Sequence, residues 1–332
     1  MQNSPIIADN THALAWTDLW RRGVLHSCAS GIEGNYDGAI ADFWTTRFQT
    51  LNDRDCVVDL ATGNGALALL AAHHAEARGI TLDIHGIDLA DIAPARDTAG
   101  NERLLSSIHF HPRTAIHDLP FADGSIPLLV SQFGFEYAGD RASAEEMIRV
   151  LANDGRIALI LHSKDSLVAQ TAPLQLAGID YLLGQSLIGD TARMAGLLAT
   201  HRSPDRRRAL IGSAAAEPIR LAFNHSVNAL MDRLDAEPDT HVLKQATQQI
   251  ATILKLADQG RLEDIQRATL GWQDALLAEQ ARLEQLGRAL LSAEQLAQIA
   301  QWFRDTGLQV ETSAIHRSAN SPMGWSLIAD HG

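Results

Sequence analysis

Apolar residues in the first half of the chain come in short runs separated by stretches with helical periodicity. Five such runs lie between residues 55 and 162. This alternation is typical of a parallel sheet with helices on both faces, because parallel strands need long crossover connections. The turn signal Asn153-Asp154-Gly155 precedes the fifth run. The predicted strands span residues 56–60, 81–87, 107–111, 128–131 and 156–161.

The strand pattern stops after the fifth run and returns near the C-terminus. Residues 164–291 show only helical segments rich in Ala, Leu, Gln and Arg, and residues 261–290 could form one long helix. A helix over 292–307 follows, with Ser292 as its N-cap and Gly307 as its stop signal. The last two predicted strands, 309–316 and 324–329, are joined through a turn at Asn320-Ser321-Pro322. So short a connection requires antiparallel pairing.

These patterns predict an α/β fold with a doubly wound, mostly parallel, Rossmann-like sheet of seven strands. The sheet has an antiparallel C-terminal strand, and the chain carries a large all-helical insertion. The predicted domains are an N-terminal helical cap (1–50), an α/β domain (51–163 with 292–332) and the helical insertion (164–291). We expect the insertion to serve as a lid, as the interface of a homodimer, or as both.

Composition narrows the possible partners. The formal net charge of −13 over 332 residues argues against a nucleic-acid partner, which would require a basic face. No apolar run approaches the roughly 20 residues that span a bilayer. The N-terminus lacks a basic segment followed by an apolar core, and two cysteines provide no disulfide framework. We therefore expect a cytoplasmic protein without membrane partners.

The most informative segment follows the first predicted strand. Asp59 lies in the strand, a small-residue loop ends at Gly65, and a helix begins beside it. Such a turn brings backbone N–H groups close to a ligand, and it suits a phosphate loop, a dinucleotide fingerprint or an S-adenosylmethionine site. No Lys follows the glycines, which excludes a phosphate-loop NTPase. Gly63, Gly65 and Ala68 fit a dinucleotide motif, but a carboxylate inside the strand favours a cofactor with an ammonium group.

Four segments, in order, resemble the class I S-adenosylmethionine-dependent methyltransferase family. The loop Asp59–Gly65 resembles the family's Asp-x-Gly-x-Gly-x-Gly, with Ala61 replacing the first glycine. Asp88 closes the second strand, where the family has an acidic residue. Residues 119–125 resemble Leu-Pro-Phe-x-Asp-x-Ser, and residues 146–155 resemble Glu-x-x-Arg-Val-Leu-x-x-Gly-Gly. The antiparallel C-terminal pair also fits this family's sheet.

The resemblance implies S-adenosyl-L-methionine as the cofactor. Asp88 would accept hydrogen bonds from the ribose hydroxyls. Tyr36 would lie over the methionine half, and the backbone at Ala115 and Ile116 would contact the adenine, since Ala115 replaces the family's acidic residue. The complete predicted cofactor set is Tyr36, Asp59, Ala61, Thr62, Gly63, Asn64, Gly65, Asp88, Leu89, Ala115, Ile116, Ser131, Gln132 and Phe133.

Methyl transfer depends mainly on placing and desolvating the acceptor, and a base is needed only for a hydroxyl or a protonated amine. The candidate catalytic residues are His162 and Glu136, which follow the fifth and fourth predicted strands. Alternatively, His162 caps its strand and Glu136 begins a helix. The fourth strand ends in Ser131-Gln132-Phe133-Gly134, which lacks the Asn/Asp-Pro-Pro-Tyr/Phe signature of enzymes that methylate DNA bases.

No metal site is predicted. His73 and His74 are neighbours on a helix and point apart, and His109 and His111 share one strand face but lack a third ligand nearby in the sequence. The predicted function is S-adenosylmethionine-dependent methyl transfer to a small-molecule acceptor. The alternatives are an NAD-dependent oxidoreductase and a non-catalytic binding protein of the same fold. The sequence does not distinguish an oxygen, nitrogen, sulfur or carbon acceptor.

Overall fold

The computed structural model describes residues 5–27, 34–237, 240–318 and 321–332. By its internal contacts the chain divides into two units. The first, which we call the α/β unit, comprises residues 1–170 and 285–332, and the second, the helical unit, comprises residues 171–284.

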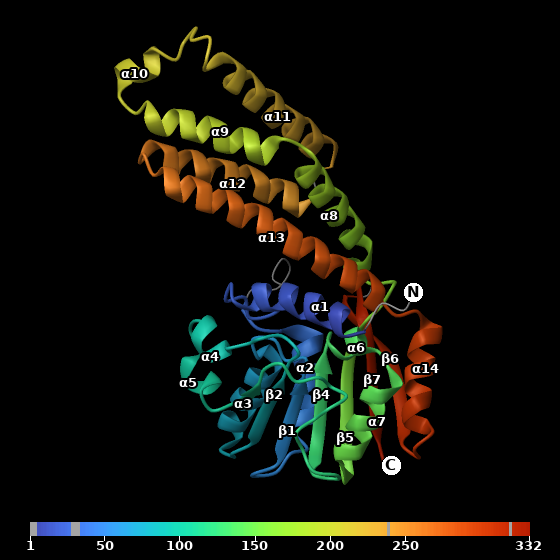
Figure 1. Cartoon of the computed structure of the whole chain (residues 1–332). Helices are drawn as coiled ribbons and strands as arrows, with labels where there is room; N and C mark the ends of the chain where they lie inside the picture. Colours follow the sequence, from blue (N-terminus) through green and yellow to red (C-terminus); the bar gives the residue numbers. More distant parts are fainter. Residues whose placement is uncertain (1–4, 28–33, 238–239, 319–320) are drawn as a thin grey trace. The chain divides into compact units, whose positions relative to one another are not determined.

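Seven strands of the α/β unit form one sheet in the order β3-β2-β1-β4-β5-β7-β6 (Figure 1). Neighbouring strands from β3 to β5 run parallel, and β7 pairs antiparallel with both β5 and β6. The strands are β1 (Cys56–Leu60), β2 (Asp83–Ile87), β3 (His109–His111), β4 (Ile126–Gln132), β5 (Leu151–His162), β6 (Gln309–Ser318) and β7 (Ser321–Asp330). The predicted fold class, including the antiparallel C-terminal pair, is confirmed.

The fifth strand begins earlier than predicted. Asn153-Asp154-Gly155, predicted as a turn before the strand, lies inside β5. Leu151 pairs with Ile126, and Arg156 pairs with Leu128, so residues 152–155 stand opposite Pro127 alone. Proline has no N–H to give to the ladder, and a bulge is where a strand tolerates it. These residues do break the regular strand, but as a bulge within β5 and not as a turn before it.

The C-terminal strands are longer than predicted. The predicted turn at Asn320-Ser321-Pro322 is wrong for two of its residues, because Ser321 and Pro322 belong to β7. Ser321 pairs with Ser318 and Pro322 with His316, with register shifts beside both pairs. Asn320 lies outside the described residues. Pro322 is tolerated here because the ladder is irregular at this end.

Helices cover both faces of the sheet. On one face, α2 (Gly38–Phe48) and α3 (Ala66–Arg78) pack with alternate residues of β1, β2 and β4. On the other face, α7 (Arg141–Val150) and α14 (Ala293–Arg304) pack on β1, β4, β5 and β7 (Figure 1). The remaining helices of this unit are α1 (Pro5–Trp20), α4 (Pro94–Asp97), α5 (Glu102–Leu105) and α6 (Phe135–Ala138). This arrangement confirms the doubly wound prediction.

The start of α14 follows its predicted capping signal. The Ser292 hydroxyl accepts a hydrogen bond from the Gln295 N–H, and the Gln295 side chain accepts one from the Ser292 N–H. This reciprocal capping box satisfies two backbone donors at the helix start. After the helix, Gly307 adopts a left-handed φ of +92°, which explains a glycine at this stop.

The helical unit contains no strand among its described residues. Its elements are α9 (Leu187–Thr200), α10 (Pro204–Arg208), α11 (Glu217–Ala236) and α12 (His241–Asp258), with most of α8 (Leu167–Gly184) and α13 (Leu262–Ala289). The predicted single long helix over 261–290 is thus present as α13. Throughout the described segments, every helix is too short or too polar to cross a lipid bilayer.

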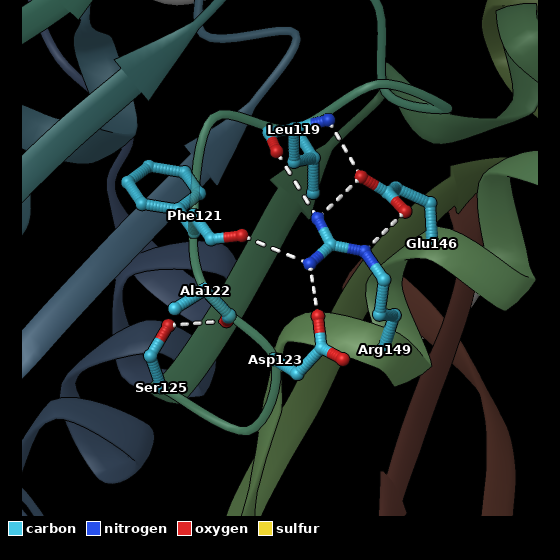
Figure 2. Close-up of polar contacts among 7 residues, drawn as sticks. All are labelled: Leu119, Phe121, Ala122, Asp123, Ser125, Glu146 and Arg149. Atoms are coloured by element: carbon cyan, nitrogen blue, oxygen red, sulfur yellow. Dashed lines mark hydrogen bonds and ion pairs between the residues drawn. The ribbon is translucent and has the colours of Figure 1, made fainter.

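The segment that resembles Leu-Pro-Phe-x-Asp-x-Ser is held by one arginine. Arg149 of α7 donates hydrogen bonds to the carbonyl oxygens of Leu119 and Phe121 and pairs with Asp123 and Glu146 (Figure 2). Glu146 also accepts the Leu119 N–H at 2.7 Å. These ion pairs raise the pKa of Arg149 further and lower that of Glu146. Residues 119–125 and 146–155 are therefore held together by these ion pairs and hydrogen bonds, which fix the connection before β4.

Candidate cofactor and active site

The loop after β1 turns through left-handed backbone conformations. Ala61, Gly63 and Gly65 have φ values of +54°, +55° and +82°. The Thr62 N–H donates to the Ile87 carbonyl of β2, and the Gly65 N–H closes a turn to the Thr62 carbonyl. Glycine adopts this conformation freely, whereas for an alanine such as Ala61 the Cβ costs about 1 kcal/mol. Ala61, which replaces the glycine of the family's motif, therefore adopts a left-handed conformation in this loop.

Two buried carboxylates flank this loop. Asp59 of β1 accepts the Thr62 hydroxyl at 2.6 Å. Asp88, which follows β2, accepts the backbone N–H groups of Gly63 and Ala90, each at 2.8 Å. Asp88 therefore fixes the loop after β1 relative to β2. These hydrogen bonds leave lone pairs on both carboxylates for a further donor.

Burial changes the ionisation of both groups. Desolvation raises the pKa of the Asp59 carboxyl to about 7 and that of the Asp88 carboxyl to about 6. The hydrogen bonds from Thr62 to Asp59, and from Ala90 and Gly63 to Asp88, lower these pKa values and only partly offset the effect of burial. A ligand that donates hydrogen bonds or brings a positive charge would favour the ionised forms.

A cavity of about 790 Å³ opens beside the loop, at the carboxyl ends of the parallel strands. This is a size typical of cofactor and substrate sites, and its place fits the rule for ligand binding in open α/β sheets. The predicted residues that line it are Tyr36, Asp59, Ala61, Thr62, Asp88, Leu89, Ala115, Ile116, Gln132, Phe133 and Glu136.

Five predicted site residues do not line the cavity: Gly63, Asn64, Gly65, Ser131 and His162. They belong to the loop after β1 and to the ends of β4 and β5. The Ser131 hydroxyl donates to the Leu60 carbonyl and accepts the Phe135 N–H, which ties the ends of β1 and β4 together. Gly65 is the N-cap of α3, and a Cβ added there would lie 2.8 Å from the ring of Phe110.

The N-terminal helix forms part of the cavity wall. Trp16 and Trp20 of α1 line the cavity, and a Cβ on Gly63 would lie 2.5 Å from the Trp20 ring. The Asn64 side chain donates to the carbonyl oxygens of Trp20 and Val24 at 2.8 and 2.7 Å. Asn64 thus anchors the N-terminal segment to the loop, a role that the sequence analysis did not assign.

Glu136 and His162 are in direct contact. One carboxylate oxygen of Glu136, Oε1, lies 2.7 Å from His162 Nδ1 and accepts the His162 backbone N–H at 2.8 Å. The His162 ring stacks on Phe133, with 4.3 Å between the centroids. Phe133 has a left-handed φ of +55°, an uncommon conformation for a bulky side chain that is concentrated at functional sites. Only Glu136 of the pair lines the cavity.

Among the described residues that line the cavity, three have a buried polar atom without a hydrogen-bond partner: Glu136 (Oε2), Gln132 (Nε2) and His26 (Nδ1). The Gln132 amide is oriented by Trp44, whose indole N–H donates to Gln132 Oε1. The indole is a donor only, so Oε1 must face it and Nε2 remains to donate elsewhere. Buried polar atoms are normally paired, so an acceptor and a donor here point to a polar ligand.

Several lining residues were missed by sequence reasoning: Ala13, Trp16, Trp20, His117, Gln285 and Arg288. Trp16 donates its indole N–H to Gln285 at 2.8 Å across 269 residues of chain. Nothing in the sequence connects these positions. A general signal was present, because Trp16 and Trp20 are aromatic residues within the predicted N-terminal helical cap (1–50).

Residues 57–155 match the family model described as a methyltransferase domain. No curated protein matches significantly. Among solved structures, the chain resembles a SAM-dependent methyltransferase from Aquifex aeolicus at 17% identity, with a TM-score of 0.31 and 37% of this chain covered. It also resembles phosphoethanolamine N-methyltransferase 1 from Haemonchus contortus at 16% identity, with a TM-score of 0.37 and 48% covered. A third likeness is geranyl diphosphate methyltransferase, at 18% identity, with a TM-score of 0.32 and 46% covered.

The aligned parts span 64%, 34% and 63% of those three chains, which is less than two thirds of each. Likenesses at this level carry no information about activity. The family-model match lies wholly within the α/β unit, and that unit has the mixed seven-stranded sheet that the resemblance implied. Residues 57–155 of the α/β unit therefore match a methyltransferase domain model, as the resemblance to the class I S-adenosylmethionine-dependent family led us to expect.

Proposed function

We propose that the protein transfers the methyl group of S-adenosylmethionine to a small-molecule acceptor. The observation that carries this proposal is the pair of buried carboxylates, Asp59 and Asp88, at the wall of a cavity of about 790 Å³. Asp88 would hold the ribose hydroxyls, and Asp59 the ammonium end of the methionine part. Bound there, the cofactor supplies the activated methyl group and its own leaving group.

The small-molecule acceptor is supported by the cavity and by charge. A cavity that encloses the acceptor excludes water from the reaction. Its mixture of aromatic and polar side chains suits a small organic molecule. The net charge of −13 disfavours nucleic acid as the acceptor.

Glu136 is the proposed general base. Glu136 lines the cavity, and its Oε2 is buried without a hydrogen-bond partner, while Oε1 is held by His162. A carboxylate held through one oxygen and without a hydrogen-bond partner at the other can accept a proton from an acceptor hydroxyl or ammonium group. His162 positions Glu136 and does not itself line the cavity.

The cofactor site is tested by isothermal titration of the protein with S-adenosylhomocysteine. We expect Asp88→Asn to weaken binding at least tenfold, because the ribose loses a charge-assisted partner and an amide NH₂ would face a backbone N–H. Asp118→Asn, at an exposed position near the same cavity segment, is the matched control and should bind like the wild type. Equal affinities of the wild type and Asp88→Asn, or binding of NADH in place of S-adenosylhomocysteine, would reject the proposal.

Binding is also expected to depend on pH. With pKa values of about 7 for Asp59 and about 6 for Asp88, lowering the pH from 8 to 5.5 protonates both carboxyls in the ligand-free protein. The dissociation constant of S-adenosylhomocysteine should then rise about tenfold or more, since each protonated group must lose its proton for the proposed contacts to form. Calorimetry at several pH values measures this effect, and Asp59→Asn should flatten the profile.

The stability of the ligand-free protein should, in contrast, decrease as the pH rises. Its folded state keeps protons that the unfolded chain, with an ordinary aspartate pKa of 3.8, releases. The stability contributed by this difference is complete below about pH 4 and is lost as the pH rises to about 7.

For the binding prediction, a dissociation constant of S-adenosylhomocysteine that stays constant between pH 8 and 5.5 would contradict the assigned roles of both carboxylates.

A further inference from the structure

A cluster of metal-ligating side chains lies on three adjacent strands at the edge of the sheet. The parallel register pairs Cys56 of β1 with Asp83 of β2, and His85 of β2 with His109 of β3. Directly paired residues share a face of a sheet, and so do residues two apart on a strand. Cys56, Asp83, His85, His109 and His111 therefore all lie on one face.

Their polar atoms come close together. Single ligand atoms of Cys56, Asp83 and His85 lie within 4.8 Å of one another. The His85 Nε2 is 3.1 Å from Asp83 Oδ1, and the His109 Nε2 is 3.8 Å from the same oxygen. On its other side, His85 Nδ1 lies 2.9 Å from His111 Nε2.

We propose that this cluster is a binding site for a divalent transition metal, with Zn²⁺ as the best match. Cys56 would provide a thiolate, Asp83 a carboxylate oxygen and His85 its Nε2, a mixed sulfur, oxygen and nitrogen set that suits zinc. The exposed His109, whose Nε2 lies 3.8 Å from Asp83 Oδ1, is the candidate for the fourth ligand. Hard cations such as Mg²⁺ and Ca²⁺ prefer oxygen ligands and do not fit this set.

His111 would contact the ligand His85 without binding the proposed metal itself. A neutral imidazole carries one ring proton, and metal on His85 Nε2 requires that proton on Nδ1. Nδ1–H would then donate to His111 Nε2, an arrangement that typically orients a histidine ligand. Without metal, the same contacts are satisfied when His111 donates to His85 and His85 donates to Asp83. The cluster is thus a hydrogen-bonded chain that metal binding would reverse.

The surroundings leave the cluster accessible on one side and supported on the other. The side chains of Asp83 and His109 are 53% and 66% exposed, whereas that of His85 is 16% exposed. Phe121, whose carbonyl oxygen is held by Arg149, places its ring edge-on to His85 at 5.1 Å. Solvent can deliver an ion, and the packed phenyl ring limits movement of the central histidine.

The site is separate from the proposed cofactor cavity, because none of the cluster's residues lines that cavity. A metal here would join β1, β2 and β3, the first two of which lead into Asp59 and Asp88 at their carboxyl ends. Metal binding to a preformed cluster adds to the stability of the folded state. The inferred role is therefore structural, and it does not depend on the proposed methyl transfer.

The test uses the full-length protein after removal of metal with a chelator. Titration with Co²⁺, which reports thiolate ligands by near-ultraviolet charge-transfer absorption, is followed by competition with Zn²⁺. We expect one equivalent to bind with this absorption and to raise the unfolding temperature. Cys56→Ser should abolish the band, His85→Gln should weaken binding about 100-fold, and His111→Gln about tenfold or more.

Matched controls exclude general histidine binding and misfolding. His73→Gln removes an exposed histidine of α3 and should leave affinity and absorption unchanged. Asp83→Asn removes a half-exposed ligand, so it should weaken metal binding without loss of the folded state. Absence of the thiolate band in the wild type, or equal affinities of wild type, Asp83→Asn and His73→Gln, would overturn the proposal.

Discussion

Glu136→Gln is expected to lower the rate of methyl transfer by about 10²–10⁴-fold, the usual contribution of a general base. Binding of S-adenosylhomocysteine should change less than about twofold, because the substitution keeps the shape of the side chain. The amide carbonyl oxygen of the variant side chain can still accept the His162 backbone N–H that Glu136 Oε1 accepts at 2.8 Å. What is lost is a negatively charged oxygen at the position of Oε2, which has no partner in the cavity wall.

The measurement needs an acceptor, which a panel of small hydroxyl and amine compounds assayed for S-adenosylhomocysteine release would provide. Glu145→Gln on α7 is the matched control, since Glu145 is exposed and forms a surface ion pair with Arg141. If Glu136→Gln retains the wild-type rate with an acceptor that must lose a proton, Glu136 is not the base. Loss of cofactor binding in this variant would instead assign Glu136 to the cofactor site.

Gly134→Ala is the second substitution with a large expected effect. A Cβ on Gly134 would lie 2.5 Å from the Ala61 Cβ and 3.0 Å from the Ser131 hydroxyl. Gly134 has a negative φ of −137°, so it is required for space and not for its backbone conformation. We expect a destabilisation of about 1–3 kcal/mol and a tenfold or greater loss of affinity for S-adenosylhomocysteine, because the loops after β1 and β4 must separate.

A second substitution should reverse much of this loss. Ala61→Gly removes the methyl group that the new side chain meets, and it also relieves the left-handed strain at φ +54°. The double variant should therefore recover most of the stability and affinity, with a coupling energy of about 1–3 kcal/mol. Gly271→Ala in α13, where a Cβ meets nothing within 4 Å, controls for the exchange itself. Additive effects of the two substitutions would contradict direct contact between the loops.

The sequence predicted all seven strands and the antiparallel C-terminal pair, because most of the strands contain a short apolar run, although several strand ends differ from the prediction. The first strand was placed at residues 56–60, as β1 is, since charged residues precede Cys56 and the small-residue loop follows Leu60. The bulge in β5 was not foreseen, because Asn153-Asp154-Gly155 has the same local chemistry in a bulge as in a turn. The bulge is distinguished from a turn only by the pairing of this segment with β4 around Pro127.

The site was predictable where it is local and unpredictable where it is assembled from distant segments. The loop residues around Asp59 carry their own motif, whereas the contact of Trp16 with Gln285 depends on tertiary structure. The histidine cluster shows the same limit. His109 and His111 lacked a third ligand in sequence, and Cys56, Asp83 and His85 come from neighbouring strands. The roles expected of the insertion, as lid or dimer interface, stay predictions.

The position of β7 between β5 and β6 has a consequence for the order of folding during synthesis. Arg156 of β5 bonds Asp330 of β7 across 174 residues, and the whole helical unit, residues 171–284, lies between them in the chain. A ribosome therefore finishes the helical unit before the sheet can close. Until the last strands emerge, β5 presents an unpaired edge, which is a site of aggregation in incomplete chains. Closure of this sheet, with its long-range pairing, should be the slow and chaperone-sensitive event in the maturation of the protein.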